Sequence, residues 1–166
     1  MQRIRDVVEH TITPSWINSV PHNFGDAAAG SLKADEWRTM STIYLPLALI
    51  SLWGEGTSHP SPNIGMKYRQ ILDHTMAVVS AIILACMRTM SQARAMAYCT
   101  YIAIYIRDLQ TLHPEATRRG NQHMAMHIYD FLCLFGPVHS WWCFPFECLI
   151  GQIQCLLSNH KIGESL

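Results

Sequence analysis

The chain has 166 residues, of which 49% are hydrophobic and only 14% are charged. This length suits a single domain with a sizeable core. The charged fraction lies well below the usual ~25%, which predicts either an unusually apolar surface or a piece of a larger assembly. The twelve basic and twelve acidic residues give a formal net charge of zero, which argues against a free-standing nucleic-acid binder.

The cysteines and the amino-terminal sequence favour an intracellular protein. The six cysteines include no Cys-x-x-Cys pair, and MQRIRDVVEH lacks the apolar core of a signal peptide. We therefore expect reduced cysteines that serve as small core residues, and a nuclear or cytoplasmic location. The longest apolar stretch, residues 75–87, is shorter than the ~20 residues that a membrane crossing needs, so no membrane span is predicted.

The first third of the chain predicts two helices joined by a loop. Residues 2–10 form a short helix, and residues 18–30 form a loop rich in proline and glycine. Ser31 is a candidate N-cap for the next helix. That helix runs to about Trp53, with a kink expected at Pro46 because proline lacks the backbone N–H.

The two longest helices are predicted over residues 66–89 and 91–112, after a loop at 54–65. Apolar residues recur at i, i+3 and i+4 in the first of them, and Ser91 caps the second. The short connection predicts antiparallel packing. In the second helix the residues expected to face inward are Met96, Cys99, Ile102, Ala103, Ile106 and Leu109.

Two more helices complete the predicted fold, an all-α bundle of about five or six helices in one domain spanning 1–166. The first covers residues 121–135 and ends at Gly136, and the second runs from about Pro145 to about Asn159. No clear run of alternating apolar residues predicts a strand. The last helix is expected to face the core with Phe146, Leu149, Ile150, Ile153 and Leu157.

A histidine pair in the segment NQHMAMHIYD is one candidate site. His123, His127 and Asp130 stand at i, i+4 and i+7, so they share one helical face. Such a pair could bind zinc, with cysteines as further ligands, although no second ligand pair has a recognised spacing. Alternatively, the histidines are structural and hydrogen-bond across a buried helix junction. Stability should then fall below about pH 6, because buried neutral histidines resist protonation.

Glu147 is a second candidate, as the only acid between Asp130 and Glu164. It follows a run of aromatic residues at the start of the last helix, where it could be a metal ligand or general base. The alternative is a glutamate that the helix dipole favours at this position. Gly151, in mid-helix, suggests that another backbone approaches closely there. The aromatic residues are Trp141, Trp142, Phe144 and Phe146.

The loop ATRRGNQH is a third feature. It places Arg118 and Arg119 beside Gly120. These side chains could contact a phosphate backbone, or they could lie in a solvated loop.

Three motifs recur together in one known family: LKADEWR (32–38), NQHMAMH (121–127) and FGPVHSWWCFPFE (135–147). In this order and at these separations they resemble the catalytic region of CACTA-type (En/Spm-like) cut-and-paste DNA transposases, and the fungal Plavaka-like elements look most similar. The resemblance runs from about Ile12 to about Lys161, which is nearly the whole chain.

This resemblance implies an RNase H-like core in which two aspartates and one glutamate hold Mg²⁺ or Mn²⁺. A helical insertion lies between the second aspartate and the glutamate. The chain corresponds to that insertion and the segment that follows it, with Glu147 in FPFE as the candidate third acid. The family pattern continues with Asn-Gly after two residues, whereas here Ile150 precedes Gly151, a departure that puts the segment's activity in doubt.

We therefore expect a transposase-derived helical fragment that is not catalytic alone and holds no cofactor in isolation. A single glutamate cannot hold two metal ions. The expected partners are DNA, a full-length transposase or a second copy, and no membrane. The alternatives are a helical metal- or ligand-binding or protein-interaction module that uses His123 and His127, or a degenerate reading frame without a selected role.

Overall fold

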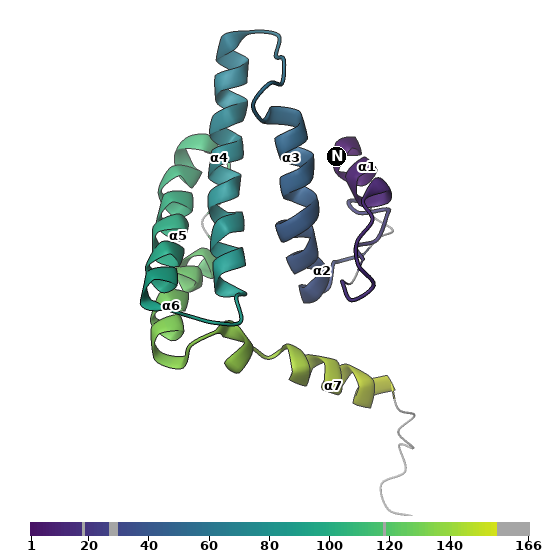
Figure 1. The fold of residues 1–166 in the computed structure, drawn as a ribbon, viewed down its shortest axis with the longest axis vertical. Coiled ribbons are helices and arrows are strands. Elements are labelled where there is room, and N and C mark those ends of the chain that lie inside the picture. The colour runs from purple at the N-terminus through teal and green to yellow at the C-terminus, as the bar shows by residue number, and fades with distance from the viewer. Residues whose placement is uncertain (18, 27–29, 118, 156–166) are drawn as a thin grey trace, which may run out of the picture.

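The computed structural model describes residues 1–17, 19–26, 30–117 and 119–155 (Figure 1). These residues form helices, turns and loops without a strand, so the predicted all-α fold is confirmed. If α2, η2 and α3 are counted as one continuous helix, the described part contains six α-helical segments. The elements in chain order are α1 (Gln2–His10), α2 (Ala34–Thr39), the π-helix η2 (Met40–Tyr44), α3 (Leu45–Trp53), α4 (Pro62–Ala85), α5 (Gln92–Leu112), α6 (Gly120–Phe135), the 3₁₀-helix η3 (Val138–Ser140) and α7 (Phe144–Cys155).

The interruption expected at Pro46 takes the form of a π-turn. The wide turn Met40–Tyr44 directly precedes this part of the helix, and the N–H of Leu45 donates to the carbonyl of Met40. A proline removes one helical hydrogen bond and crowds the carbonyl one turn back. The extra residue in the turn relieves that crowding, so the helix continues to Trp53 as the sequence predicts.

Several predicted helix ends are confirmed and others are corrected. The sequence predicts a helix over residues 66–89, but α4 begins at Pro62, where Ser61 is the N-cap, and ends at Ala85. Ser91 caps α5 through its side chain, and Gly136, with φ of 76°, ends α6. Ser31 is not the cap of α2. The helix begins after Lys33, whose backbone N–H donates to the carboxylate of Glu36 over 2.7 Å. Glu36, in the first turn, therefore satisfies the backbone N–H at the start of the helix, and Ser31 does not serve as the predicted cap.

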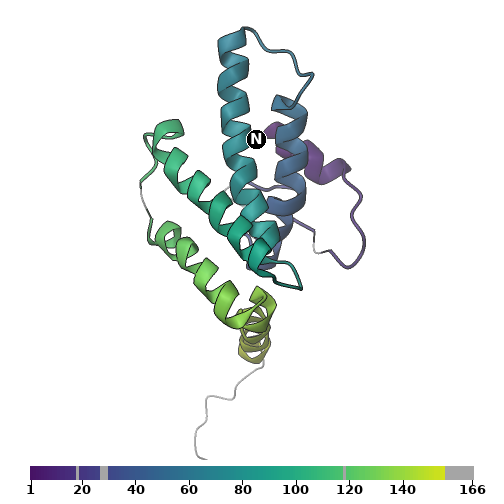
Figure 2. The same ribbon diagram turned by 60° about the vertical axis from the view of Figure 1, so that its left-hand side comes forward.

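The main core lies where α5 packs between α4 and α6 (Figure 2). The two longest helices, α4 and α5, run antiparallel as predicted (Figures 1 and 2). The inward face of α5 differs in part from the prediction, because Met96 and Ala103 are exposed whereas Ala95 and Tyr98 are buried. The face of α5 that packs against α4 and α6 therefore includes Tyr98, whereas the side chain of Ala103 lies on the exposed face. The buried core residues are Ala81, Ala85, Ala95, Tyr98, Ile102 and Leu132.

Two buried hydrogen bonds connect the three core helices. The hydroxyl of Tyr98 on α5 donates to the carbonyl of Ala125 on α6 over 2.7 Å. Nε2 of His74 on α4 donates to the carbonyl of Tyr105 on α5 over 2.9 Å, and the two rings stack with centroids 4.8 Å apart. Burial raises the pKa of Tyr98 to about 12, so its hydroxyl keeps its proton and remains a donor at neutral pH.

A second apolar cluster fastens the amino-terminal segment to the π-turn. It joins Val8 of α1 and Val20 to Met40 and Tyr44. Both turn residues are almost fully buried. Arg5 supports the same packing, since its guanidinium donates to the carbonyl of Phe24 over 3.1 Å and pairs with Asp26.

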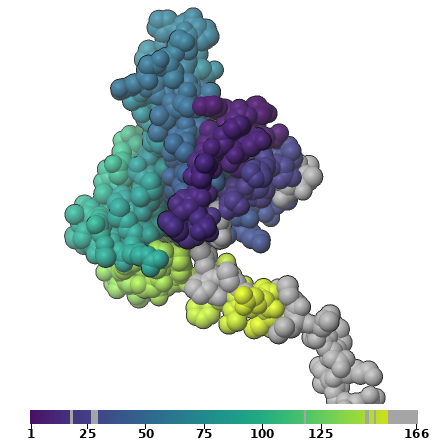
Figure 3. All heavy atoms as spheres, turned by 45° about the vertical axis from the view of Figure 1, so that its right-hand side comes forward, coloured from purple at the N-terminus to yellow at the C-terminus, as the bar shows by residue number. Residues whose placement is uncertain are grey.

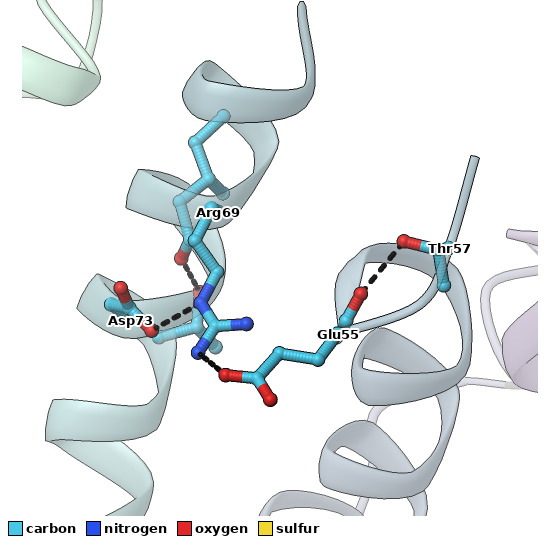
Figure 4. Close-up of polar contacts among 7 residues, drawn as sticks. Glu55, Thr57, Arg69 and Asp73 are labelled. Atoms are coloured by element: carbon cyan, nitrogen blue, oxygen red, sulfur yellow. Dashed lines mark hydrogen bonds and ion pairs between the residues drawn. The ribbon is translucent and has the colours of Figure 1, made fainter. Parts of the chain in front are cut away.

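The loop between α3 and α4 is held by an exposed ion network (Figure 4). Arg69 on α4 lies 3.2 Å from Asp73 on its own helix and 3.6 Å from Glu55 in the loop. Thr57 donates to the carbonyl of Gly54 over 2.8 Å. Such exposed pairs contribute little to stability, on the order of 0–1 kcal/mol, so they orient the loop more than they stabilise the fold.

Within the described residues, no helix is both long and apolar enough to cross a membrane.

We expect Leu132→Ala to lower the free energy of unfolding by about 2–5 kcal/mol, because it opens a cavity in the main core. The matched control is Leu134→Ala on the same helix, where 72% of the side chain is exposed, and its cost should stay below about 0.5 kcal/mol. Urea unfolding followed by circular dichroism measures both. Equal costs at the two positions would contradict this assignment of the core.

Candidate functional site

The segment after α6 forms a corner that docks against the bundle. Nε1 of Trp141 donates to the carbonyl of Gly136 over 3.2 Å, and its ring meets Phe131 edge-on at a centroid distance of 5.6 Å. Nε2 of His139 donates to the carbonyl of Cys86 at the end of α4 over 2.9 Å. These contacts attach the 3₁₀-helix η3 to both α4 and α6.

Trp142 connects this corner to α2. Its indole is half-buried, with the ring of His139 at a centroid distance of 4.1 Å. The guanidinium carbon of Arg38 lies 6.0 Å from the centroid of the same indole, which is within the range of a cation–π contact. The motifs LKADEWR and FGPVHSWWCFPFE, about a hundred residues apart in sequence, therefore meet in space.

The three motifs that carry the resemblance to transposases, at residues 32–38, 121–127 and 135–147, all contribute to one apolar groove of about 440 Å³. Trp37 and Arg38 come from the first motif, Ala125 from the second, and Trp141 and Trp142 from the third. The groove continues over the main core. Ala34 of the first motif and Val138 of the third also line it. The lining residues outside the three motifs are Ser41, Val78, Ala81, Ile82, Ala85, Cys86, Tyr98, Ile102 and Ile128.

The Cys86 thiol on this groove is not an activated nucleophile. Burial raises the pKa of Cys86 above its usual value, and the charge of Arg38 offsets this only in part. A thiol with a raised pKa stays protonated at neutral pH and reacts slowly. The groove therefore offers apolar contact surface rather than a reactive group.

Glu147 lies exposed in the first turn of α7, where the sequence predicted it. Its backbone N–H donates to the carbonyl of Cys143 over 2.9 Å. The helix dipole favours a negative charge at this position.

The expectation that α7 faces the core is wrong. The helix extends away from the bundle (Figures 1 and 3). Apart from its chain neighbours and the backbone of its own helix, no described atom lies within 4 Å of the position that a Cβ on Gly151 would take. Among the described residues, the close backbone approach predicted at Gly151 is therefore absent. The side chains of Phe144 and Leu157 lie outside what the structure describes. The exposed fractions are 66% for Phe146, 52% for Leu149, 53% for Ile150 and 56% for Ile153.

His123 and His127 are both exposed on α6, which corrects the prediction that one of them is buried. The inward face of α6 carries Leu132 and Ile128, and the histidines lie outside it. Their Nε2 atoms are 3.2 Å apart, and Nδ1 of His127 lies 3.6 Å from Oδ2 of Asp130. The predicted fall in stability below about pH 6 assumed that one of these imidazoles is buried. Because both rings are exposed, that reason no longer applies to them.

The two Nε2 atoms of the histidine pair lie at hydrogen-bonding distance, which is also a spacing that two ligands of one zinc ion can have. Two nitrogen ligands on a tetrahedral zinc ion, each at ~2.0–2.1 Å, stand about 3.3 Å apart. The Nε2–Nε2 distance of 3.2 Å is close to that value. Asp130 lies beside the second ring, where a carboxylate can orient a ligating histidine. The described residues contain no group of three or more potential ligands, and Glu147 does not join the pair.

His74 is buried, although the sequence pattern does not indicate it. It lies in the middle of an otherwise helical, apolar pattern, and nothing in the spacing of the sequence distinguishes a buried histidine from an exposed one. Only the carbonyl of Tyr105, supplied by the neighbouring helix, explains why this ring can be buried.

Comparisons with known protein families, curated proteins and solved structures found no match to this chain.

We expect Glu147→Gln to change the free energy of unfolding by less than about 1 kcal/mol, because the carboxylate is exposed and interacts mainly with the helix dipole. Trp141→Ala should cost about 2 kcal/mol or more, because it removes an edge-to-face contact and a hydrogen bond. Thermal and urea unfolding of the two variants provide the measurement. A strongly destabilising Glu147→Gln would make this glutamate a structural residue.

Proposed function

We propose that this chain is the helical insertion and third-acid segment of a CACTA-type transposase-like protein, and that it presents Glu147 to a catalytic centre whose other acids come from elsewhere. The convergence of the three resemblance motifs on one groove supports this proposal. Motifs that belong to one functional unit are expected to lie together, and residues 32–38 and 121–147 do so although they are distant in sequence.

The positions of the acids support a role that depends on a partner. Asp73 pairs with Arg69 on its own helix, and Asp108 pairs with the adjacent Arg107. Neither contacts Glu147. Two-metal phosphoryl transfer requires several carboxylates around ions about 3.5–4 Å apart. Glu147 therefore needs at least two further acids, which the resemblance assigns to an RNase H-like core.

The exposed apolar side chains of α7 suggest how that core is engaged. Helix α7 extends away from the bundle (Figure 3). It begins two residues after Trp142, which lines the groove, and Glu147 lies in its first turn. Burial of one large apolar side chain is worth about 1.5–3 kcal/mol. A partner surface that covers Leu149, Ile150 and Ile153 would gain several such contributions and would fix Glu147 at its edge.

The test is to combine this chain with the RNase H-like part of a Plavaka-like transposase that lacks its own insertion and glutamate. We expect the two to form a complex that cleaves DNA with Mg²⁺ or Mn²⁺, whereas neither part cleaves alone. Glu147→Gln should preserve the complex and abolish cleavage. The paired change Leu149→Asp and Ile153→Asp should abolish the complex itself.

Leu134→Asp is the control, because it places a negative charge on an exposed leucine of α6. It should leave both assembly and cleavage unchanged. Metal-dependent cleavage by the isolated chain that is lost in Glu147→Gln would contradict the requirement for a partner, and the absence of any complex would contradict the proposed role of α7.

A metal-binding role is a second candidate, favoured by the Nε2–Nε2 distance in the histidine pair. On this hypothesis His123 and His127 bind Zn²⁺, and the remaining ligands are water or groups from a partner. Equilibrium dialysis should then show zinc binding that either His→Ala variant removes, while His22→Ala, at an exposed histidine far away in sequence, leaves it intact. Zinc binding that survives in both variants would exclude the pair as the site.

A further inference from the structure

A second cleft, of about 390 Å³, lies between the carboxyl-terminal half of α5 and the beginning of α6. Its volume falls in the range of small-molecule sites, about 300–1,000 Å³. Ile106, Leu109 and Met126 give it an apolar wall. Its polar residues are Arg107, Gln110, Arg119, Gln122 and His123.

Both charged side chains that line this cleft are basic, although the chain as a whole has a formal net charge of zero. Arg107 comes from α5 and Arg119 is the residue that precedes α6, and none of the described residues that line the cleft is acidic. Asp108, which is not among the lining residues, pairs with Arg107 and offsets part of its charge. The carboxylate of Asp108 accepts hydrogen bonds from Nε and Nη2 of Arg107 over 2.6 and 2.8 Å. A guanidinium has five N–H donors, so Arg107 keeps three donors for a ligand.

The beginning of α6 adds to this positive potential. No acidic residue occupies its first turn, although acids are favoured there by the helix dipole. The side chain of Gln122 accepts the backbone N–H of Arg119 over 3.0 Å. This contact fixes the backbone from which the arginine side chain extends.

We propose that this cleft binds a phosphomonoester whose organic part lies against the apolar wall, with a nucleoside monophosphate as the representative ligand. Guanidinium groups match phosphate oxygens in both charge and geometry, and two arginines line the cleft, one on α5 and one directly before α6. The apolar wall opposite provides contact area that inorganic phosphate alone would leave uncovered. This inference is independent of Glu147 and α7, so it can fail without affecting the proposed transposase role.

The experiment titrates the full chain with AMP, inorganic phosphate and adenosine, with EDTA present so that no metal on the histidine pair can bridge to phosphate. Calorimetry gives the affinity, and ¹H–¹⁵N spectra give the location. We expect AMP to bind more tightly than phosphate, adenosine not to bind, and the amides of residues 119–123 to shift. Arg107→Gln and Arg119→Gln should each weaken AMP binding about tenfold, the effect of losing a charged hydrogen bond.

Arg88→Gln is the matched control, since Arg88 is an exposed arginine in the connection between α4 and α5. It should bind AMP as the unchanged chain does, and thermal unfolding should show that all variants fold. A short DNA strand without terminal phosphates distinguishes the backbone phosphodiester from the monoester. Binding of that strand without binding of AMP would overturn the proposal, as would AMP binding that both cleft variants leave unchanged.

Discussion

The packing of α5 between α4 and α6 is the constraint on which the apolar groove and the basic cleft depend. Two buried hydrogen bonds hold this stack in register, from Tyr98 to the carbonyl of Ala125 and from His74 to the carbonyl of Tyr105. Each connects a side chain on one helix to the backbone of the next, so a shift of either helix would leave a buried polar group without a partner. The apolar groove opens on one side of the stack, and the basic cleft opens where α5 and α6 separate.

Helix α7 contributes to the apolar surface that the composition predicted. Four large apolar side chains on one twelve-residue helix are more than half exposed, and isolated helices of this length are marginal in water. Further exposed apolar side chains occur on α3 and α6, such as Ile50 and Leu134. Exposed apolar surface of this kind is typical of sites that contact another protein.

The candidate groups occupy separate places on this framework. Glu147 lies in the first turn of α7, the histidine pair lies on the exposed side of α6, and Arg107 and Arg119 line the cleft between α5 and α6. Several acids on the helices pair with neighbours in sequence, as Asp73 does with Arg69. Among the described residues, no group of three or more metal-binding side chains forms around Glu147.

The sequence by itself determined the helices and several of their ends, although α4 begins and ends four residues before the predicted positions. Periodicity gave the antiparallel pair α4 and α5, Ser91 and Gly136 marked two ends, and Pro46 marked the place where the helix needed a wider turn. Such signals are local, since caps and prolines act on the backbone within one turn. The exposure of α7 and of the histidine pair was decided only by tertiary packing. A helical apolar face shows which side prefers burial, but whether it is buried depends on a neighbouring surface. On α6 the neighbouring helices cover Leu132 and leave His127 exposed. On α7 no described part of the chain covers the large apolar side chains.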